Sequence, residues 1–170
     1  MKAAVLTISD GCYHKKREDT SGQKLSQMLT ENQWEVVSTD IVPDELSRIQ
    51  EQILELSQDA EIDLIVTTGG TGLAPRDVTP EAIRPLLEKE IAGLPELMRL
   101  RGLESTDFAA LSRSLAGTRG ATLILSLPGS PKGATQSLQA VLNILPHAVD
   151  ILHGKTAHGA TDNRQQTTDS

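Results

Sequence analysis

Short apolar runs alternate with amphipathic helical segments along this chain, and that alternation restricts the possible folds more than any other feature. Continuous apolar runs at 3–8, 63–68 and 121–127 are typical of strands buried on both faces of a sheet. The segment 35–42 is rich in β-branched residues and predicts another strand. Because strands that alternate with helices form a mainly parallel sheet with helices on both faces, we expect an α/β fold.

Apolar spacing predicts the helices between these strands. Four side chains at the spacing i, i+3, i+7 and i+8 predict a helix after the strand at 35–42: Leu46, Ile49, Ile53 and Leu54. Further helices are expected over 21–32 and 95–104. Five apolar positions predict one long helix after residue 131: Ala134, Leu138, Val141, Leu142 and Leu145. The segment 111–119 is compatible with either a strand or an irregular loop.

Two dipeptides, Thr79-Pro80 and Ser130-Pro131, mark helix starts. A hydroxyl side chain at the N-cap accepts a hydrogen bond from the first turn, and proline fits the first helical position. We therefore expect Thr79 and Ser130 to cap the helices that follow them.

The composition fits a single domain in a reducing compartment. The 170 residues are enough to enclose a hydrophobic core in one domain, 1–154, whereas 155–170 lacks apolar periodicity and is predicted to be a flexible tail. Cys12 is the only cysteine, so an intrachain disulfide is impossible and a cytoplasmic location is expected. The net charge of −7 argues against nucleic-acid binding. No stretch approaches the roughly 20 apolar residues of a membrane span.

The carboxyl ends of parallel strands lie along one edge of a sheet, and ligands bind outside that edge. Four segments follow the predicted strands there: Ser9-Asp10, Asp44, the turn from Gly69 to Gly72 with Asp77 beyond it, and Pro128-Gly129-Ser130. The sequence therefore predicts that acidic and glycine-rich segments from distant parts of the chain meet in one cleft.

The segment 67–82, TTGGTGLAPRDVTPEA, carries the strongest signal for a binding site. In the turn Gly69-Gly70-Thr71-Gly72, glycine lets the backbone approach a ligand, and the amides can cradle phosphate oxygens. The segment lacks the Gly-Lys-Ser/Thr of a Walker A loop, and Pro75 takes the place of the third glycine of the dinucleotide fingerprint. A tight turn without a ligand is the alternative.

Two aspartates are candidates to hold a magnesium ion, which prefers oxygen ligands and bridges phosphates. Asp77 follows the glycine turn, and because Thr79 is expected to cap the next helix, Asp77 is less needed for that purpose. A turn residue that binds backbone amides is the alternative for Asp77. Asp44 lies at the same predicted edge, but it also precedes a helix and is equally well interpreted as an N-cap.

A second anion site is predicted at 127–133, LPGSPKG. It combines a glycine turn, the Ser130 hydroxyl, a helix N-terminus and Lys132 in the first turn. A helix cap without a ligand is an equally strong interpretation. Two such sites at one edge favour two phosphorylated substrates bound side by side.

The ordered motifs resemble those of the molybdopterin adenylyltransferase family, whose branches include the bacterial Mog and MoaB proteins and a domain of gephyrin-like proteins. Four segments carry the resemblance: ISD at 8–10, VPDE at 42–45, TTGGTGLAPRDVTPEA at 67–82 and LPGSPKG at 127–133. GLPELMR at 93–99 and SRSLAG at 112–117 are also similar in kind and order. The resemblance spans nearly the whole chain up to residue 154.

The resemblance implies a three-layer α-β-α sandwich with a mostly parallel sheet, assembled as a homotrimer. The family transfers AMP from Mg²⁺-ATP to molybdopterin, releases pyrophosphate, and leaves adenylyl-molybdopterin for molybdate insertion by a downstream protein. Its two important aspartates match Asp44 and Asp77, as catalytic residues and metal ligands. The motifs also match three candidate binding segments: Ser9-Asp10, Gly69 to Gly72, and Pro128 to Pro131 with Lys132. Ser130 stands where relatives often carry Asn.

Two other functions stay open at this point. A family member that binds molybdopterin without adenylating it would keep the pocket and lose the chemistry, although the presence of both aspartates favours catalysis. A nucleotide hydrolase on the same scaffold, as in competence-damage proteins, would release AMP or phosphate without a pterin acceptor.

Overall fold

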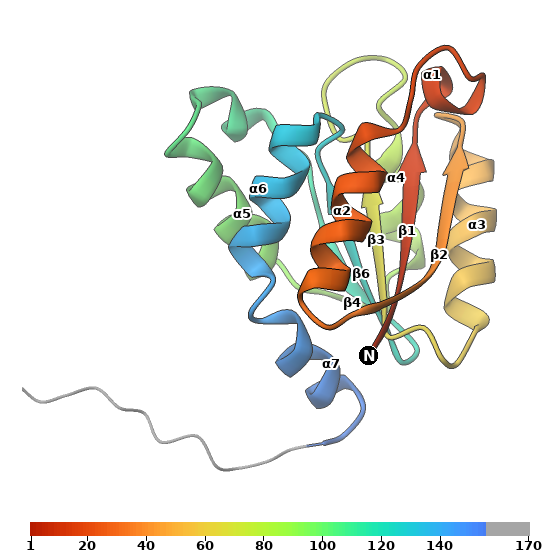
Figure 1. Ribbon diagram of the computed structural model, residues 1–170, viewed down its shortest axis with the longest axis vertical. Helices are drawn as coiled ribbons and strands as arrows, with labels where there is room; N and C mark the ends of the chain where they lie inside the picture. Colours follow the sequence, from red (N-terminus) through yellow and green to blue (C-terminus); the bar gives the residue numbers. More distant parts are fainter. Residues whose placement is uncertain (156–170) are drawn as a thin grey trace, which may run out of the picture.

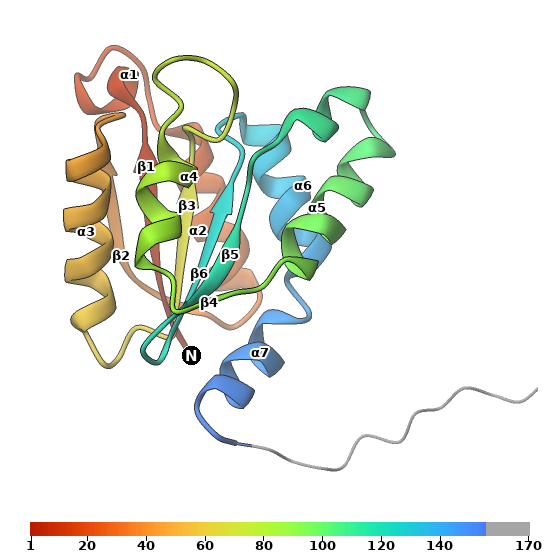
Figure 2. The same cartoon turned by 180° about the vertical axis from the view of Figure 1, so that it is seen from behind.

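A computed structural model describes residues 1–155, which form three layers with one sheet in the middle (Figures 1 and 2). The six strands are ordered β2-β1-β3-β6-β5-β4 across the sheet. β2, β1, β3 and β6 are parallel, and β5 runs antiparallel to both of its neighbours. The expected mostly parallel α/β fold is therefore confirmed. The strands are Lys2–Ile8 (β1), Glu35–Val42 (β2), Leu64–Thr68 (β3), Lys89–Glu90 (β4), Ala116–Arg119 (β5) and Thr122–Leu127 (β6).

Helices cover both faces of the sheet (Figures 1 and 2). The α-helices are Asp10–Tyr13 (α1), Thr20–Glu31 (α2), Leu46–Gln58 (α3), Thr79–Ile83 (α4), Gly93–Leu103 (α5), Pro131–Val141 (α6) and Leu145–Leu152 (α7). Two short 3₁₀ helices add Arg84–Leu86 (η1) and Asp107–Leu111 (η2). Helices α2, α5, α6 and α7 pack on one face, and α3 and α4 pack on the other.

Alternate residues of the central strands supply the two cores. In β1, Ala3 and Val5 face the core beneath α2 and α6, whereas Ala4, Leu6 and Ile8 face the core beneath α3 and α4. Because successive strand residues point to opposite faces, a strand covered on both sides is apolar at most positions. This explains the apolar runs in the sequence, and the buried Thr7 hydroxyl in β1 is satisfied by donating to the Asp19 carboxylate.

The long helix expected after residue 131 is wrong in its length. Helix α6 ends at Val141, a turn follows, and α7 begins at Leu145. Pro146 in the first turn of α7 lacks an amide proton, and its ring would clash with the Leu142 carbonyl of a continuous helix. The apolar positions are nevertheless buried, because both helices pack on the same core.

Two other local expectations needed correction or resolution. Leu46 was expected on the apolar face of α3 but is 44% exposed, and the buried side chains are Ile49, Ile53 and Leu56. The segment 111–119, for which the sequence allowed either a strand or a loop, contains strand β5 after the end of η2. The predicted tail lies outside the described residues from 156 onward.

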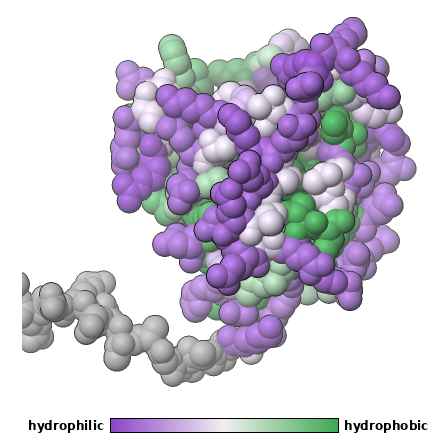
Figure 3. All heavy atoms as spheres, in the orientation of Figure 1, coloured by the Kyte–Doolittle hydropathy of each residue, from purple (hydrophilic) through white to green (hydrophobic). Residues whose placement is uncertain are grey.

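The molecular surface is mainly hydrophilic on the face shown in Figure 3, where apolar side chains form separate small patches. Within residues 1–155, no helix has both the length and the apolar character needed to cross a membrane.

Replacing Leu138 with Ala should destabilise the protein by about 2–5 kcal/mol, because Leu138 is fully buried between α6 and the sheet. Equilibrium urea unfolding at one fixed protein concentration measures this change. Leu46→Ala is the matched control, since Leu46 is exposed on α3. Equal losses of unfolding free energy in the two variants would contradict this account of the core.

Candidate functional site

The carboxyl ends of β1, β2, β3 and β6 converge at the upper edge of the sheet in Figure 1. The chain passes from β1 to the edge strand β2 and then back to β3 on the other side of β1. In open α/β sheets, such a reversal of strand order opens a crevice at the carboxyl ends. The loops predicted to carry ligands leave the sheet at this edge.

Asp10 and Asp44 tie the ends of β1 and β2 together by reciprocal hydrogen bonds. The Asp10 amide donates to Asp44 Oδ2 over 2.7 Å, and the Asp44 amide donates to Asp10 Oδ1 over 3.0 Å. Arg76 adds a bidentate interaction with the Asp10 carboxylate, with its Nη2 2.9 Å from Oδ2. The N-cap alternative for Asp44 is wrong, because α3 begins after Glu45 without a side-chain cap.

The glycine turn is bound to β6 at its first residue, Gly69, whereas the backbone amides of its next three residues have no partner among the described residues. The Gly69 amide donates to the Leu127 carbonyl over 3.1 Å, so it is not free to bind a phosphate. Gly69 and Gly70 have φ of 108° and 63°, a region that favours glycine, and a side chain at Gly69 would collide with the Ile8 carbonyl. Among the described residues, no acceptor engages the amides of Gly70, Thr71 and Gly72, which leaves these three as candidate phosphate donors.

Thr79 does not cap the following helix as expected. Its hydroxyl donates instead to the Gly69 carbonyl over 2.8 Å, and its amide donates to the Gly70 carbonyl over 3.0 Å. Val78 stands at the N-cap position of α4 without a side-chain hydrogen bond. Thr79 therefore fixes the glycine turn, whereas Ser130 caps α6 as predicted, accepting from the Gly133 amide over 3.2 Å.

Asp77 and Asp44 both lie beside the glycine turn, at Gly72 and Gly70 respectively. A Cβ at Gly72 would be 2.8 Å from Asp77 Oδ2, and one at Gly70 would be 3.3 Å from Asp44 Oδ1. Asp77 Oδ2 also accepts from the Ala74 amide over 2.8 Å, which is the turn contact considered as its alternative role. The structure thus brings both aspartates to the glycine turn, as the sequence predicted.

Burial raises the pKa of Asp44 above its ordinary value, and the charges of Asp10 and Asp77 raise it further. The Asp10 amide and Arg76 oppose this rise without cancelling it. Burial also raises the pKa of Asp10, but the Asp44 amide and the Arg76 guanidinium outweigh that effect and bring the net pKa below its ordinary value. The site therefore concentrates negative charge around Asp44.

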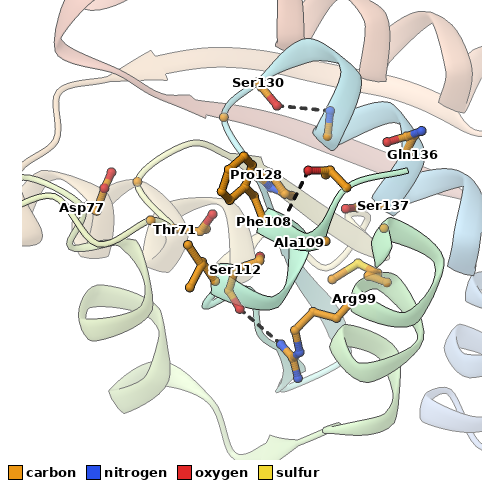
Figure 4. Close-up of a pocket in the computed structure, with 18 residues that line it drawn as sticks. Thr71, Asp77, Arg99, Phe108, Ala109, Ser112, Pro128, Ser130, Gln136 and Ser137 are labelled. Carbon is orange, nitrogen blue, oxygen red and sulfur yellow. Dashed lines mark hydrogen bonds between the residues drawn. The ribbon is translucent and has the colours of Figure 1, made fainter. Parts of the chain in front are cut away.

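A pocket of about 410 Å³ opens between the glycine turn and the start of α6 (Figure 4). In this view Asp77 lies at one end and Gln136 at the other, with Phe108 and Pro128 between them. Seven of the sequence-predicted site residues line it: Gly70, Thr71, Gly72, Asp77, Pro128, Gly129 and Ser130. The two predicted anion sites therefore share one pocket.

The other predicted site residues do not line this pocket. Asp10 and Asp44 line neither it nor the neighbouring cavity, and Asp44 approaches the glycine turn at Gly70. Ser9, Gly69 and Pro131 line a neighbouring cavity of about 160 Å³. The Ser9 hydroxyl is already engaged by the Cys12 amide and by Arg17. Lys132 is exposed in the first turn of α6 and lines neither cavity.

Sequence reasoning missed the wall formed by α5 and η2 and the arginines around the turn. Met98, Arg99, Phe108 and Ser112 line the pocket, and Arg113 contacts the glycine loop. The motifs at 93–99 and 112–117 contain several of these residues, but their spacing gave no reason to select individual side chains.

Comparison with known proteins assigns the chain to a family. Residues 4–147 match the family described as "Probable molybdopterin binding domain". That range covers most of the chain, so the chain belongs to this family of molybdenum cofactor biosynthesis proteins, as the sequence motifs indicated.

Individual relatives support the same assignment. The chain is 39% identical over 152 residues to the molybdopterin adenylyltransferase of Helicobacter pylori strain J99, covering 88% of this chain and 86% of that protein. It is 47% identical over 150 residues to the molybdenum cofactor synthesis protein cinnamon of Drosophila melanogaster, covering 87% of this chain but only 25% of that protein. A crystal structure of the molybdopterin biosynthesis enzyme MoaB from Thermus thermophilus superimposes with a TM-score of 0.85 at 50% identity, covering 90% of this chain and 96% of that one.

Replacing Asp44 with Asn should stabilise the protein at neutral pH. Because the folded-state pKa of Asp44 is raised, its carboxylate destabilises the native state increasingly as the pH rises from the unfolded-state value through the folded-state value. An Asn side-chain oxygen can still accept the Asp10 amide. In EDTA, D44N should show a higher Tm than the wild type at neutral pH. The difference should shrink below the ordinary aspartate pKa of about 3.9. An unchanged or lower Tm at neutral pH would refute the charge argument.

Proposed function

We propose that this chain transfers AMP from Mg²⁺-ATP to the terminal phosphate of molybdopterin, giving adenylyl-molybdopterin and pyrophosphate. One observation carries the proposal: Asp44 and Asp77 lie beside a glycine turn that lines one pocket together with the capped start of α6. The Helicobacter pylori relative is named a molybdopterin adenylyltransferase, and the match covers most of both chains, which supports the same reaction here.

The carboxylates at the turn suit a magnesium ion shared with a substrate. Among residues 1–155, no group of three or more acidic, histidine or cysteine side chains is arranged to hold a metal by itself. Magnesium in nucleotide sites is commonly held by one or two carboxylates together with substrate phosphates. Asp77 and Asp44 would hold the ion, which when bound would neutralise phosphate charge.

The reaction needs positioning rather than a covalent enzyme intermediate. An oxygen of the molybdopterin phosphate forms a bond to the α-phosphorus of ATP while the bond from that phosphorus to the bridging oxygen breaks, and pyrophosphate leaves. Holding the two anions in line supplies much of the acceleration in such transfers. The amides of Gly70, Thr71 and Gly72 would bind phosphate oxygens where negative charge develops.

The pocket's opposite side suits the pterin. Ser130 stands at the start of α6, where the helix dipole favours an anion. Met98, Phe108 and Leu111 add apolar surface to the wall, which suits a flat heterocycle. Ser130 and the helix start would anchor the molybdopterin phosphate, and the apolar wall would limit water near the reacting phosphates.

Replacing Asp77 with Asn should reduce AMP transfer by about 100-fold or more, because one of the two carboxylates at the phosphates loses its charge. Pyrophosphate release with ATP, Mg²⁺ and molybdopterin measures the change. Asp150→Asn is the matched control, since Asp150 lies on α7 at the other end of the molecule, where it pairs with Lys155. Full turnover by D77N would refute the proposed role.

The same assay separates the alternative functions. Release of AMP or phosphate from ATP without a pterin would identify a nucleotide hydrolase instead. Molybdopterin binding without pyrophosphate release would identify a non-catalytic family member.

The homotrimer is likewise a proposal. Leu100 and Leu103 are 63% and 43% exposed on α5 outside the pocket, and a neighbouring copy would cover apolar surface of this kind. Light scattering should give three times the chain mass of 18.3 kDa, and a monomeric mass would contradict it. The cytoplasmic location and the downstream molybdate-inserting partner stay predictions.

A further inference from the structure

Arg113 lies in the segment between η2 and β5, directly beside the loop that follows β3. Its backbone amide donates to the Thr71 carbonyl over 3.0 Å, which fixes the segment against the glycine turn. The side chain is therefore presented to the loop from a part of the chain about forty positions away, and Gly72 is one of its partners at a separation of 41 residues.

The Arg113 guanidinium joins both ends of the loop from Gly72 to Asp77. Its Nε donates to the Gly72 carbonyl over 2.7 Å, and its Nη2 donates to the Asp77 carbonyl over 2.6 Å. Its Nη1 pairs with the Glu81 carboxylate on α4. Only arginine offers several N–H donors in one rigid plane, so a lysine cannot reproduce these three contacts.

The rest of this loop has few other attachments. Residues Leu73 to Arg76 are exposed, so packing does not fix their backbone. The loop's own contacts are two hydrogen bonds between Ala74 and Asp77. The Arg76–Asp10 pair connects the loop to β1, but the Arg76 side chain is 59% exposed and solvent screens such pairs.

The Arg113 contacts help to fix the orientation of Asp77, together with the Ala74 amide that binds its carboxylate. The Asp77 carbonyl is directed to Arg113, while its carboxylate lies beside Gly72 and forms one end of the pocket in Figure 4. If the carbonyl were released, only the two hydrogen bonds with Ala74 inside this exposed loop would still orient Asp77. Its carboxylate would then leave the glycine turn for part of the time.

We propose that Arg113 is a positioning residue that keeps the Asp77 carboxylate beside Gly72 at the glycine turn, and thereby sets the affinity of this loop for the phosphates of a magnesium nucleotide. The inference rests on the proposed function in so far as the loop binds nucleotide phosphates, but it does not require that AMP be transferred.

Arg113→Ala should weaken binding of Mg²⁺ with α,β-methylene-ATP by about 10- to 100-fold, the usual effect of removing a group that orients a metal ligand. Isothermal titration calorimetry on the full chain measures the affinity without turnover. Arg113→Lys should give a smaller loss, because it keeps the charge beside Glu81 but not the planar donors, and it serves if the alanine variant unfolds. Arg119→Ala is the control, since the Arg119 guanidinium also donates to a backbone carbonyl, that of Leu86, but lies at the β5–β6 turn at the opposite edge of the sheet.

A double-mutant cycle with Asp77→Asn distinguishes positioning from general stabilisation. If Arg113 acts through Asp77, Arg113→Ala should cause little further loss of affinity in the D77N background. A lower Tm with unchanged nucleotide affinity, or fully additive losses in the double mutant, would overturn the inference. Nucleotide binding that follows the cycle in a protein that transfers no AMP would refute the proposed function alone.

Discussion

Three adjacent parallel strands, β1, β3 and β6, are buried on both faces, and the rest of the molecule depends on that constraint. A strand covered twice is mainly apolar, and the polar side chains buried in these strands are hydroxyls only (Thr7, Thr67, Thr68, Thr122 and Ser126). Charged groups are instead placed in the loops at the strand ends. Since all three strands point the same way, the loops that follow them lie at one edge of the sheet. The glycine turn, the paired Asp10 and Asp44, and the start of α6 meet at that edge.

The charge distribution at this edge is unfavourable for the protein by itself. Asp10, Asp44 and Asp77 gather around one loop, and burial together with the two neighbouring carboxylates raises the pKa of Asp44. A structural cluster selected for stability would pair these groups with cations, yet Arg76 contacts only Asp10. A carboxylate whose pKa is raised by burial and by neighbouring carboxylates is a feature of functional sites, and a bound cation would relieve the repulsion at Asp44.

Much of the fold followed from local sequence signals. The bounds of β2 were predicted correctly, and β1, β3 and β6 were displaced by at most one residue at their starts. The cap at Ser130 was predicted because its hydrogen-bond partner lies three residues away. The predictions failed where two local signals competed. The apolar periodicity favoured one long helix, but Pro146 ended it. The Thr79 hydroxyl was expected to cap its own helix, but it binds the Gly69 carbonyl instead.

The sequence by itself determined the alternating architecture, the edge at which the site lies, and the segments that reach it, because these depend on periodicity and turn chemistry within short stretches. Only the tertiary structure decided which groups touch. In the tertiary structure the Asp10 amide binds the Asp44 carboxylate, and the Gly69 amide binds the Leu127 carbonyl. The Arg113 side chain binds the Asp77 carbonyl at the end of its loop. Contacts between residues about 30 to 60 positions apart depend on how packed elements place their side chains, and no local pattern encodes that placement.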